Sequence, residues 1–181
     1  MEPHIRIAGV VTHSSNNYGP YQFPEKLIPT VIIAALEGRP IPVYGKGLNV
    51  RDWLYVYDHV EALALVLEKG KPGGVYNIGA GTDITNIEMV RALCRLLDEK
   101  LPRSPHRPHE KLITFVTDRP GHDLRYAVDS SAVRALGWKP RVSLADGLAA
   151  TVDWYLENKS WWERLRREGL CGERVGLGIR N

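Results

Sequence analysis

The 181-residue sequence has little cysteine and no long apolar run. Its two cysteines, Cys94 and Cys171, lie far apart and neither has a Cys-x-x-Cys partner, which favours a reduced protein of the cytoplasm. No stretch reaches the roughly 18 consecutive apolar residues of a membrane-spanning helix. The first residues, MEPHIRIAGVV, lack the basic start and long apolar core of a signal peptide. We therefore expect no membrane association.

Concentrated charge of one sign is also missing. The formal net charge is only +3. The densest basic run, Arg164, Arg166 and Arg167, is diluted by Glu163 and Glu168 and is typical of a solvated helix end. Proteins that bind nucleic acid usually gather their basic residues on one face. The sequence therefore predicts no nucleic-acid partner.

Several motifs of catalysis and cofactor binding are absent. Neither a GxxxxGK[ST] phosphate loop nor a GxSxG nucleophile elbow occurs. Residues 79–81 read Gly-Ala-Gly, but Ile84 stands where the third glycine of a dinucleotide fingerprint belongs, so we interpret the segment as a turn. His106 and His109 lie in a Pro-rich stretch without cysteine, and no metal site is predicted there.

One pair imitates a catalytic motif. Tyr155 and Lys159 have the Tyr-x-x-x-Lys spacing of short-chain dehydrogenases, in which the lysine lowers the pKa of the phenol so that it can transfer a proton. Here the pair lies at the end of the last long predicted helix, where a spacing of four places both side chains on one face. We interpret the spacing as helix packing.

The pattern of apolar residues is that of a mixed α/β protein. Strands are expected at 5–11, 41–44, 50–56, 75–78 and 112–116, and helices at 25–38, 58–67, 85–97 and 143–155. A polar loop is expected over 12–24. Thr85 followed by Glu88 predicts a capping box, Asp58 is a candidate helix cap, and Ser143 with Asp146 marks another helix start. So few strands predict an incomplete Rossmann sheet within a single unit spanning residues 1–181.

Side chains suited to anions stand in or beside the predicted turns. Arg51, Arg119 and Arg125 carry the planar guanidinium that makes paired contacts with phosphate. Lys26 lies in the first turn of a predicted helix, where backbone N–H groups also favour an anion. Taken singly, each arginine fits a surface ion pair better than a phosphate site. Their coexistence favours a phosphate site.

Amide and aromatic side chains add the means to recognise a sugar or a base. Asn16, Asn17 and Asn86 can each donate and accept hydrogen bonds, as sugar hydroxyls and the edge of a nucleobase require. Tyr44 could stack on a base or pack locally. Together with the arginines, these residues point to recognition of a nucleotide sugar.

The segment SNNYGPYQFPEKLIP at residues 15–29 resembles the segment after the sixth strand in nucleotide-sugar enzymes of the extended short-chain dehydrogenase/reductase type. More narrowly, it resembles the dTDP-glucose 4,6-dehydratases. The motifs PVYGKGLNVRDWLYVYDH, YNIGAG, DRPGHDLRYAVD, GWKP and NKSWWERLR follow in the family's order. The resemblance covers the chain from Val11 onward and implies the C-terminal, substrate-binding part of such an enzyme. VRDWLYV is less specific, because related epimerases and decarboxylases share it.

The resemblance implies a role for each matched position. Asn17 would reach the NAD side. Arg51 and Arg119 would hold the phosphates, and residues 42–44 would border the base. The full set expected to contact a dTDP-sugar is Asn16, Lys26, Leu27, Pro42, Val43, Tyr44, Arg51, Asn86, Asp118, Arg119, Pro120, Gly121 and His122.

The family's reaction is an internal redox cycle of a lyase. NAD takes hydride from C4 of the hexose, water leaves across C5 and C6, and hydride returns to C6. The family's glycine-rich NAD loop, Thr-Asp-Glu trio and Tyr-x-x-x-Lys pair precede the region matched here. We therefore assign no catalytic residue, expect no tight binding of NAD, and expect the chain alone to be inactive.

Alternatives remain open at the level of sequence. The chain could be a non-catalytic nucleotide-sugar-binding or interaction module, or a fragment of a UDP-sugar epimerase or decarboxylase. His13 stands where the family commonly has arginine. The missing half implies either a homo-oligomer or pairing with an N-terminal half.

Overall fold

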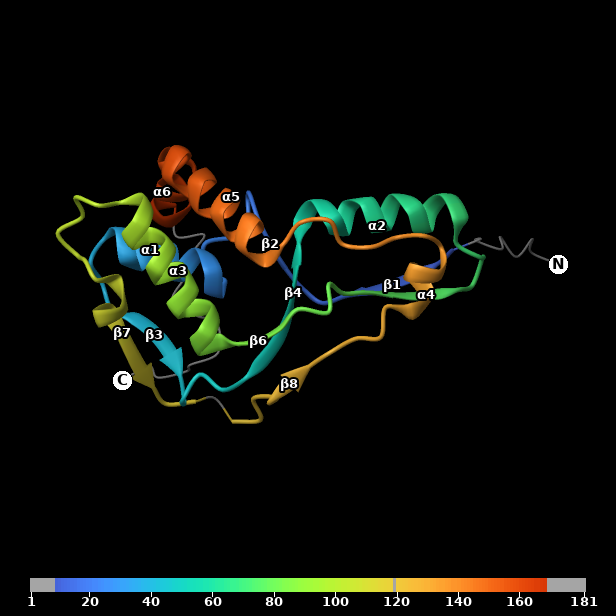
Figure 1. Ribbon diagram of the computed structural model, residues 1–181, viewed down its shortest axis with the longest axis horizontal. Coiled ribbons are helices and arrows are strands. Elements are labelled where there is room, and N and C mark those ends of the chain that lie inside the picture. The colour runs from blue at the N-terminus through green and yellow to red at the C-terminus, as the bar shows by residue number, and fades with distance from the viewer. Residues whose placement is uncertain (1–8, 119, 169–181) are drawn as a thin grey trace.

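A computed structural model describes residues 9–118 and 120–168. Figure 1 shows an elongated molecule in which helices gather at one end and a single long helix lies along the other. The helices are α1 (Leu27–Leu36), α2 (Val56–Lys69), α3 (Asn86–Lys100), the 3-10 helix η1 (His109–Leu112), α4 (Ser131–Ala135), α5 (Leu144–Glu157) and α6 (Lys159–Arg167). The strands are β1 (Val11–Ser14), β2 (Asn16–Tyr18), β3 (Ile41–Tyr44), β4 (Val50–Tyr55), β5 (Val75–Ile78), β6 (Asp83–Thr85), β7 (Ile113–Val116) and β8 (Arg125–Tyr126).

The strands form three small sheets. β1 pairs with β5 and β3 pairs with β7, both in parallel. In the third sheet β4 pairs with β6 antiparallel and with β2 and β8 in parallel. The first half of β4 carries the pairs with β6 and β8, and its second half carries the pair with β2. β4 therefore crosses the middle of the molecule, between the helices gathered at one end and α2 at the other (Figure 1).

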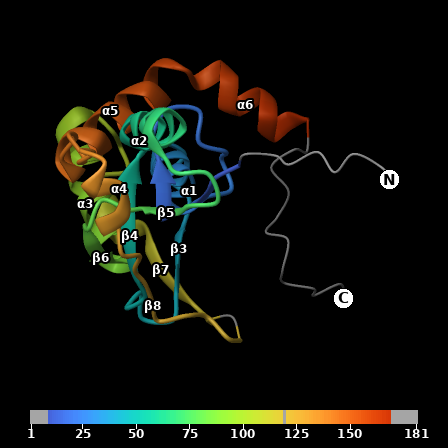
Figure 2. The same cartoon turned by 90° about the vertical axis from the view of Figure 1, so that its right-hand side faces the viewer.

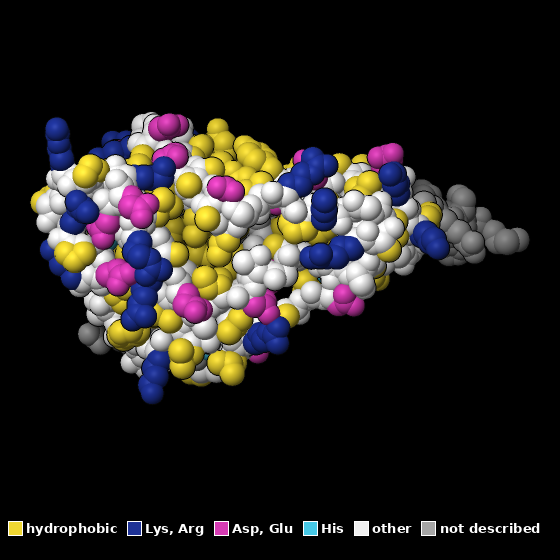
Figure 3. Space-filling model, viewed as in Figure 1, with side chains coloured by type: hydrophobic (Ala, Val, Ile, Leu, Met, Phe, Trp, Pro, Cys, Tyr) yellow, Lys and Arg dark blue, Asp and Glu magenta, His cyan; other side chains and the backbone are white. Residues whose placement is uncertain are grey.

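Two separate apolar cores lie on either side of this strand. The larger is built by α1, α3 and α5 with their neighbouring strands, and it includes the buried side chains of Ile32, Leu93 and Val152. The smaller lies under α2 and includes Val66 and Trp138. Figure 3 shows further apolar side chains at the surface of the waist between the two ends.

Much of the expected element order is confirmed. The strands at 41–44 and 75–78 match β3 and β5, and the helix predicted at 143–155 matches α5. Thr85 and Glu88 form the predicted capping box at the start of α3. Ser143 caps α5 by accepting a hydrogen bond from the backbone N–H of Asp146. In the described residues, no helix combines the length and apolarity that crossing a bilayer requires.

Four expectations need correction. The strand expected at 5–11 lies at Val11–Ser14 instead, and its first part lies outside the described residues. The expected loop over 12–24 contains β1 and β2. The helix expected from residue 25 begins at Leu27. Tyr155 and Lys159 do not share a helix face, because α5 ends at Glu157 and Lys159 begins α6.

Asp58 is buried and links α2 to residues 138–142 rather than capping a helix. α2 begins two residues earlier, at Val56, so Asp58 lies within its first turn. The carboxylate accepts hydrogen bonds from the backbone N–H groups of Arg141 and Val142, each at 3.1 Å. The carbonyl oxygen of Asp58 accepts another from the indole of Trp138 at 3.1 Å. These bonds fix the segment after α4 against α2.

Asp58→Ala is expected to lower the free energy of unfolding by about 1.5–3 kcal/mol, because two part-buried backbone N–H groups lose a charged acceptor. Urea unfolding followed by circular dichroism measures the change. Glu61→Gln is the matched control on the same helix, since its ion pair with Arg141 is exposed and should be worth about 0.2–1 kcal/mol. Equal losses in the two variants would contradict the structural role of Asp58.

Candidate functional site

Three predicted site residues meet where β3 and β7 end. Tyr44 closes β3 opposite Val116, and the chain continues from β7 into Asp118. The Asp118 carboxylate lies 2.7 Å from Nδ1 of His122. The rings of Tyr44 and His122 lie edge to face with centroids 6.5 Å apart. This group combines an aromatic face, a carboxylate and an imidazole, as recognition of a nucleobase requires.

Arg51 is a buried cation in β4 whose guanidinium is oriented by backbone oxygens. Its side chain is 5% exposed and donates to the carbonyls of Val50 at 2.7 Å and Asp123 at 2.9 Å. Its Cζ lies 4.5 Å from the ring centroid of Tyr126, within the range of a cation–π contact. Asp123, whose carbonyl accepts a hydrogen bond from Arg51, is the residue after His122. The positive charge of Arg51 is therefore one residue along the chain from the group formed by Tyr44, Asp118 and His122.

Asn86 joins the same region through the turn before β4. It is the first residue of α3, and its backbone N–H donates to the carbonyl of Asn49 at 2.9 Å. Gly47, with φ of 69°, packs closely there, because a Cβ would lie 2.8 Å from both Ile87 and Val43. The turn, the start of α3 and the segment after β7 therefore form one surface.

Asn16 and Asn17 lie in β2, on the other half of β4. Asn16 pairs with Trp53, two residues along the strand from Arg51. The side-chain NH₂ of Asn17 donates to Ser14 Oγ at 3.2 Å and to the carbonyl of Ser15 at 3.1 Å. Its Oδ1 is buried and accepts no hydrogen bond from the described residues. The NH₂ group thus fixes the amide, and its oxygen is left without a partner among the described residues.

Lys26 is less well placed than the sequence suggested. It is the N-cap residue of α1 rather than a member of its first turn. Its side chain is 59% exposed, and its Nζ lies 2.9 Å from Glu25. Leu27, half-buried, opens the helix. A ligand would have to draw Lys26 away from Glu25 to make contact with it.

The predicted residues thus fall into two groups joined by β4. Tyr44, Arg51, Asn86, Asp118 and His122 form the first, with Pro120 and Gly121 exposed in the turn between them. Asn16 and Asn17 form the second, with Lys26 and Leu27 following along the chain.

In β3, Pro42 is half-buried and Val43 packs into the larger core, so Val43 could border a base only through its backbone. Arg119 lies outside the described residues.

Sequence reasoning missed two residues that shape the first group. Asn49 is 7% exposed, and its amide donates to the carbonyl of Asp123 at 3.2 Å. Tyr126 carries the cation–π contact to Arg51. Both lie inside motifs already noted, GLNVRDW and DLRYAVD, but only the pairing of β4 with β8 brings them together.

Two phenols near β2 are not ready to transfer a proton. Burial, with the neighbouring Tyr55, Asp58 and Asp146, raises the pKa of the Tyr18 phenol beyond its ordinary value. Burial also raises the pKa of Tyr55, so both phenols stay neutral near pH 7. Among the described residues, no cluster of three His, Cys, Asp or Glu side chains could hold a metal ion.

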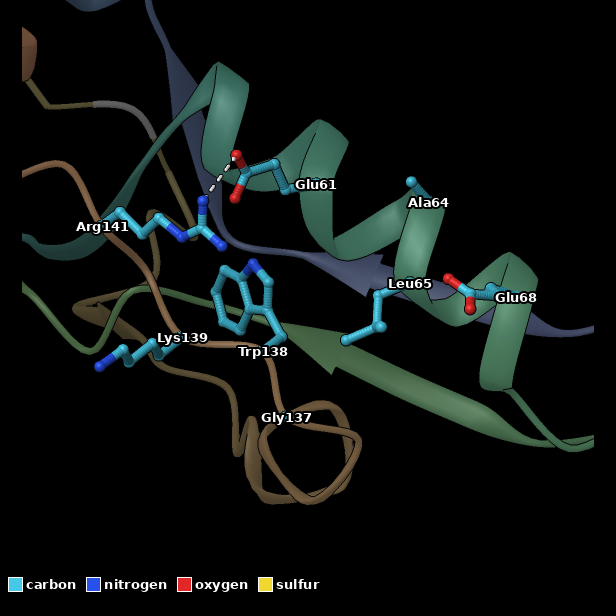
Figure 4. Close-up of a pocket in the computed structure, with 8 residues that line it drawn as sticks. All are labelled: Glu61, Ala64, Leu65, Glu68, Gly137, Trp138, Lys139 and Arg141. Carbon is cyan, nitrogen blue, oxygen red and sulfur yellow. Dashed lines mark hydrogen bonds and ion pairs between the residues drawn. The ribbon is translucent and has the colours of Figure 1, made fainter.

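A pocket at the other end of the molecule contains none of these residues. It lies between α2 and the segment 137–141, with Trp138 and Leu65 facing it (Figure 4). Glu61 and Arg141 form an ion pair of 3.4 Å across its rim. The pocket is thus separate from the candidate site.

Comparison with known proteins gives the region a context. A model of the family described as GDP-mannose 4,6 dehydratase matches residues 4–151. The dTDP-glucose 4,6-dehydratase of Escherichia coli is 51% identical over 93% of this chain and 47% of its own length. That of Xanthomonas campestris pv. campestris is 52% identical over 94% of this chain and 49% of its own. The chain spans about half the length of the curated relatives it matches.

Solved structures agree with the sequence matches. The dTDP-glucose 4,6-dehydratase of Streptomyces venezuelae, solved with NAD, has a TM-score of 0.76 at 46% identity, over 86% of this chain and 46% of that one. A UDP-glucose 4-epimerase of Thermotoga maritima, solved with UDP-glucose, has a TM-score of 0.70 at 30% identity, over 83% and 46%.

These likenesses confirm the expected fold class, an α/β portion of an extended short-chain dehydrogenase/reductase. The identities of 51–52% with the dehydratases, against 30% with this epimerase, also favour the narrower resemblance. The chain belongs to the family described as GDP-mannose 4,6 dehydratase, and it corresponds to the C-terminal half of the dTDP-glucose 4,6-dehydratases.

Proposed function

We propose that this chain is the dTDP-sugar-binding half of a dTDP-glucose 4,6-dehydratase. The observation that carries the proposal is the buried Arg51 guanidinium, held by the backbone carbonyl of Asp123, the residue that follows His122. A fixed cation next to an aromatic and hydrogen-bonding group fits a nucleoside diphosphate. The phosphates would lie at Arg51 and the base near Tyr44 and His122. The sugar would extend along β4 toward Asn16.

NAD would meet this half at only one described position. Asn17 presents a buried, unpartnered carbonyl oxygen that fits an amide N–H donor of the cofactor. When bound, NAD supplies the hydride acceptor and donor of the reaction. The role left to this chain is to bind and orient the sugar nucleotide. We accordingly propose that the chain is inactive alone, and we place it in the cytoplasm.

The partner we propose is an N-terminal, NAD-binding half, and helix α2 presents a surface for it. Ala62 and Val66 face the smaller core. On the far side, Val60, Leu63 and Leu67 form an apolar stripe, exposed by 55%, 37% and 84%. A helix that is apolar on opposite faces is usually buried between two layers. The stripe therefore fits a second layer of helices.

The sheet beside α2 is incomplete in the same way. β1 pairs only with β5 among the described strands, and Val11 and Val75 are about half exposed. Parallel sheets are almost always larger and covered on both faces. An added parallel strand at the open edge of β1 would complete the layer. The length of the relatives, about twice that of this chain, favours their other half as the occupant over a second copy.

Arg51→Lys is expected to weaken binding of dTDP by about 1–3 kcal/mol, because the ammonium keeps the charge but loses the paired donors. This corresponds to a roughly 5- to 150-fold rise in the dissociation constant, measured by calorimetry. Arg95→Lys is the control, since Arg95 is exposed on α3 beside Glu110. If both variants bind as the unmodified chain does, Arg51 does not contact the phosphates.

With NAD and dTDP-glucose added, the chain alone is expected to show no turnover, and calorimetry should detect no NAD binding. The reason is that a single amide contact cannot hold a dinucleotide. The assay follows formation of the 4-keto product, with a full-length relative as the positive control. Turnover, or tight binding of NAD, would overturn the proposal that this chain binds only the dTDP-sugar and that an N-terminal half binds NAD.

Co-expression with the N-terminal half of a dTDP-glucose 4,6-dehydratase is expected to give a copurifying complex with restored turnover. Leu67→Glu should weaken that complex, because it places a charge in the apolar stripe. Glu68→Lys, the adjacent residue outside the stripe, should not. If the unmodified chain instead self-associates in light scattering and Leu67→Glu makes it monomeric, the stripe joins two copies and the proposed partner is wrong.

A further inference from the structure

The segment between β2 and α1 contains a strained residue. Tyr21 has φ of 59°, and it is the only non-glycine residue with positive φ in the described part of the chain. This left-handed conformation is costly for a bulky side chain and persists only where the surroundings impose it. Here the tyrosine ring, although 66% exposed, lies against Trp154 and Trp161 with centroids 4.6 and 5.7 Å away.

The two tryptophans belong to the last two helices and also contact each other. Trp154 is in α5 and Trp161 in α6, and their rings lie edge to face at 5.0 Å. Figure 2 shows α5 and α6 running across the top of the molecule, with the blue segment after β2 next to them. The helix pair therefore reaches back to a segment about 130 residues earlier in the chain.

Gln22 connects this contact to the candidate site. Its side-chain NH₂ donates to the backbone carbonyl of Asn17 at 2.7 Å. The backbone carbonyl of Gln22 accepts a hydrogen bond from the hydroxyl of Tyr155, a fully buried residue of α5. Two hydrogen bonds thus lead from α5 through Gln22 to Asn17, whose side-chain oxygen has no partner among the described residues.

Helix α5 also touches the other end of the segment. Gly147 lies so close to Tyr18 that an added Cβ would overlap the phenol oxygen. Gly19 is similarly confined, since a Cβ would lie 2.6 Å from Val56. The residues from Tyr18 to Gln22 are therefore fixed from both ends.

We propose that α5 and α6 act as a clamp that sets the position of Asn16 and Asn17, with Tyr155 and Gln22 as positioning residues. The inference rests on the proposed function for the identity of the ligand. Asn17 uses its NH₂ group internally and offers only Oδ1, so the placement of its backbone determines where that oxygen lies. Small displacements of a positioning group weaken binding and orientation.

Tyr155→Phe tests the clamp, because it removes one hydroxyl and keeps the ring in the core. Hydrogen exchange of the isolated chain should show faster deuterium uptake in residues 15–26, with little change in α3. Affinity for dTDP-glucose, measured by calorimetry, should fall several-fold, because Asn16, the residue proposed to contact the sugar nucleotide, shares β2 with Asn17 and moves with it. Gln22→Glu removes the donor to Asn17 at nearly constant size and should produce the same pair of changes.

Tyr57→Phe is the matched control, since Tyr57 is an exposed tyrosine of α2 that is 59% accessible. It should alter neither uptake nor affinity. Unchanged uptake in both Tyr155→Phe and Gln22→Glu would overturn the clamp. If the unmodified chain binds no dTDP-glucose, the proposed function fails, while the exchange measurement still decides whether the clamp exists.

Discussion

Burial of both faces of β4 is the constraint on which the rest of the structure depends. Successive side chains of a strand point to opposite faces. Trp53 and Tyr55 accordingly enter the larger core, and Leu54 between them enters the smaller one. The same strand places Arg51 and Asp52, both buried, at the turn that borders the candidate site. A shift of one residue in the register of β4 would exchange the two cores and expose the cation.

The proposed binding surface is built largely on this strand. Backbone carbonyls after β7 orient the guanidinium of Arg51, and β2 carries the asparagines on the neighbouring half of β4. The arrangement is preorganised in the sense that the donors are already held before a ligand arrives, so little conformational freedom need be lost on binding.

Local sequence patterns predicted most of the helices and strands. They did not predict the hydrogen bonds between segments that are distant in the chain. The capping box at Thr85 and the start of α5 were readable because each signal spans a few residues. A three-residue strand such as β2 is too short for an alternating pattern of apolar residues to be recognised within a Pro- and Gly-rich segment. The partners of Asp58 and Arg51 lie more than 70 residues away, which no local window reveals. Motif resemblance nominated the site residues, and the structure showed which of them share a surface.

The exposed leucine of α2 has a consequence for the life of the protein in a cell. Leu67 is 84% exposed within an apolar stripe, and the edge of β1 beside it is open to another strand. Surfaces of this kind are what chaperones retain and what proteases remove. If the proposed N-terminal half is the partner, the abundance of this chain would be set by how much of that half is synthesised, because the covered form would be the one protected from degradation. Supply of one polypeptide would control the lifetime of the other.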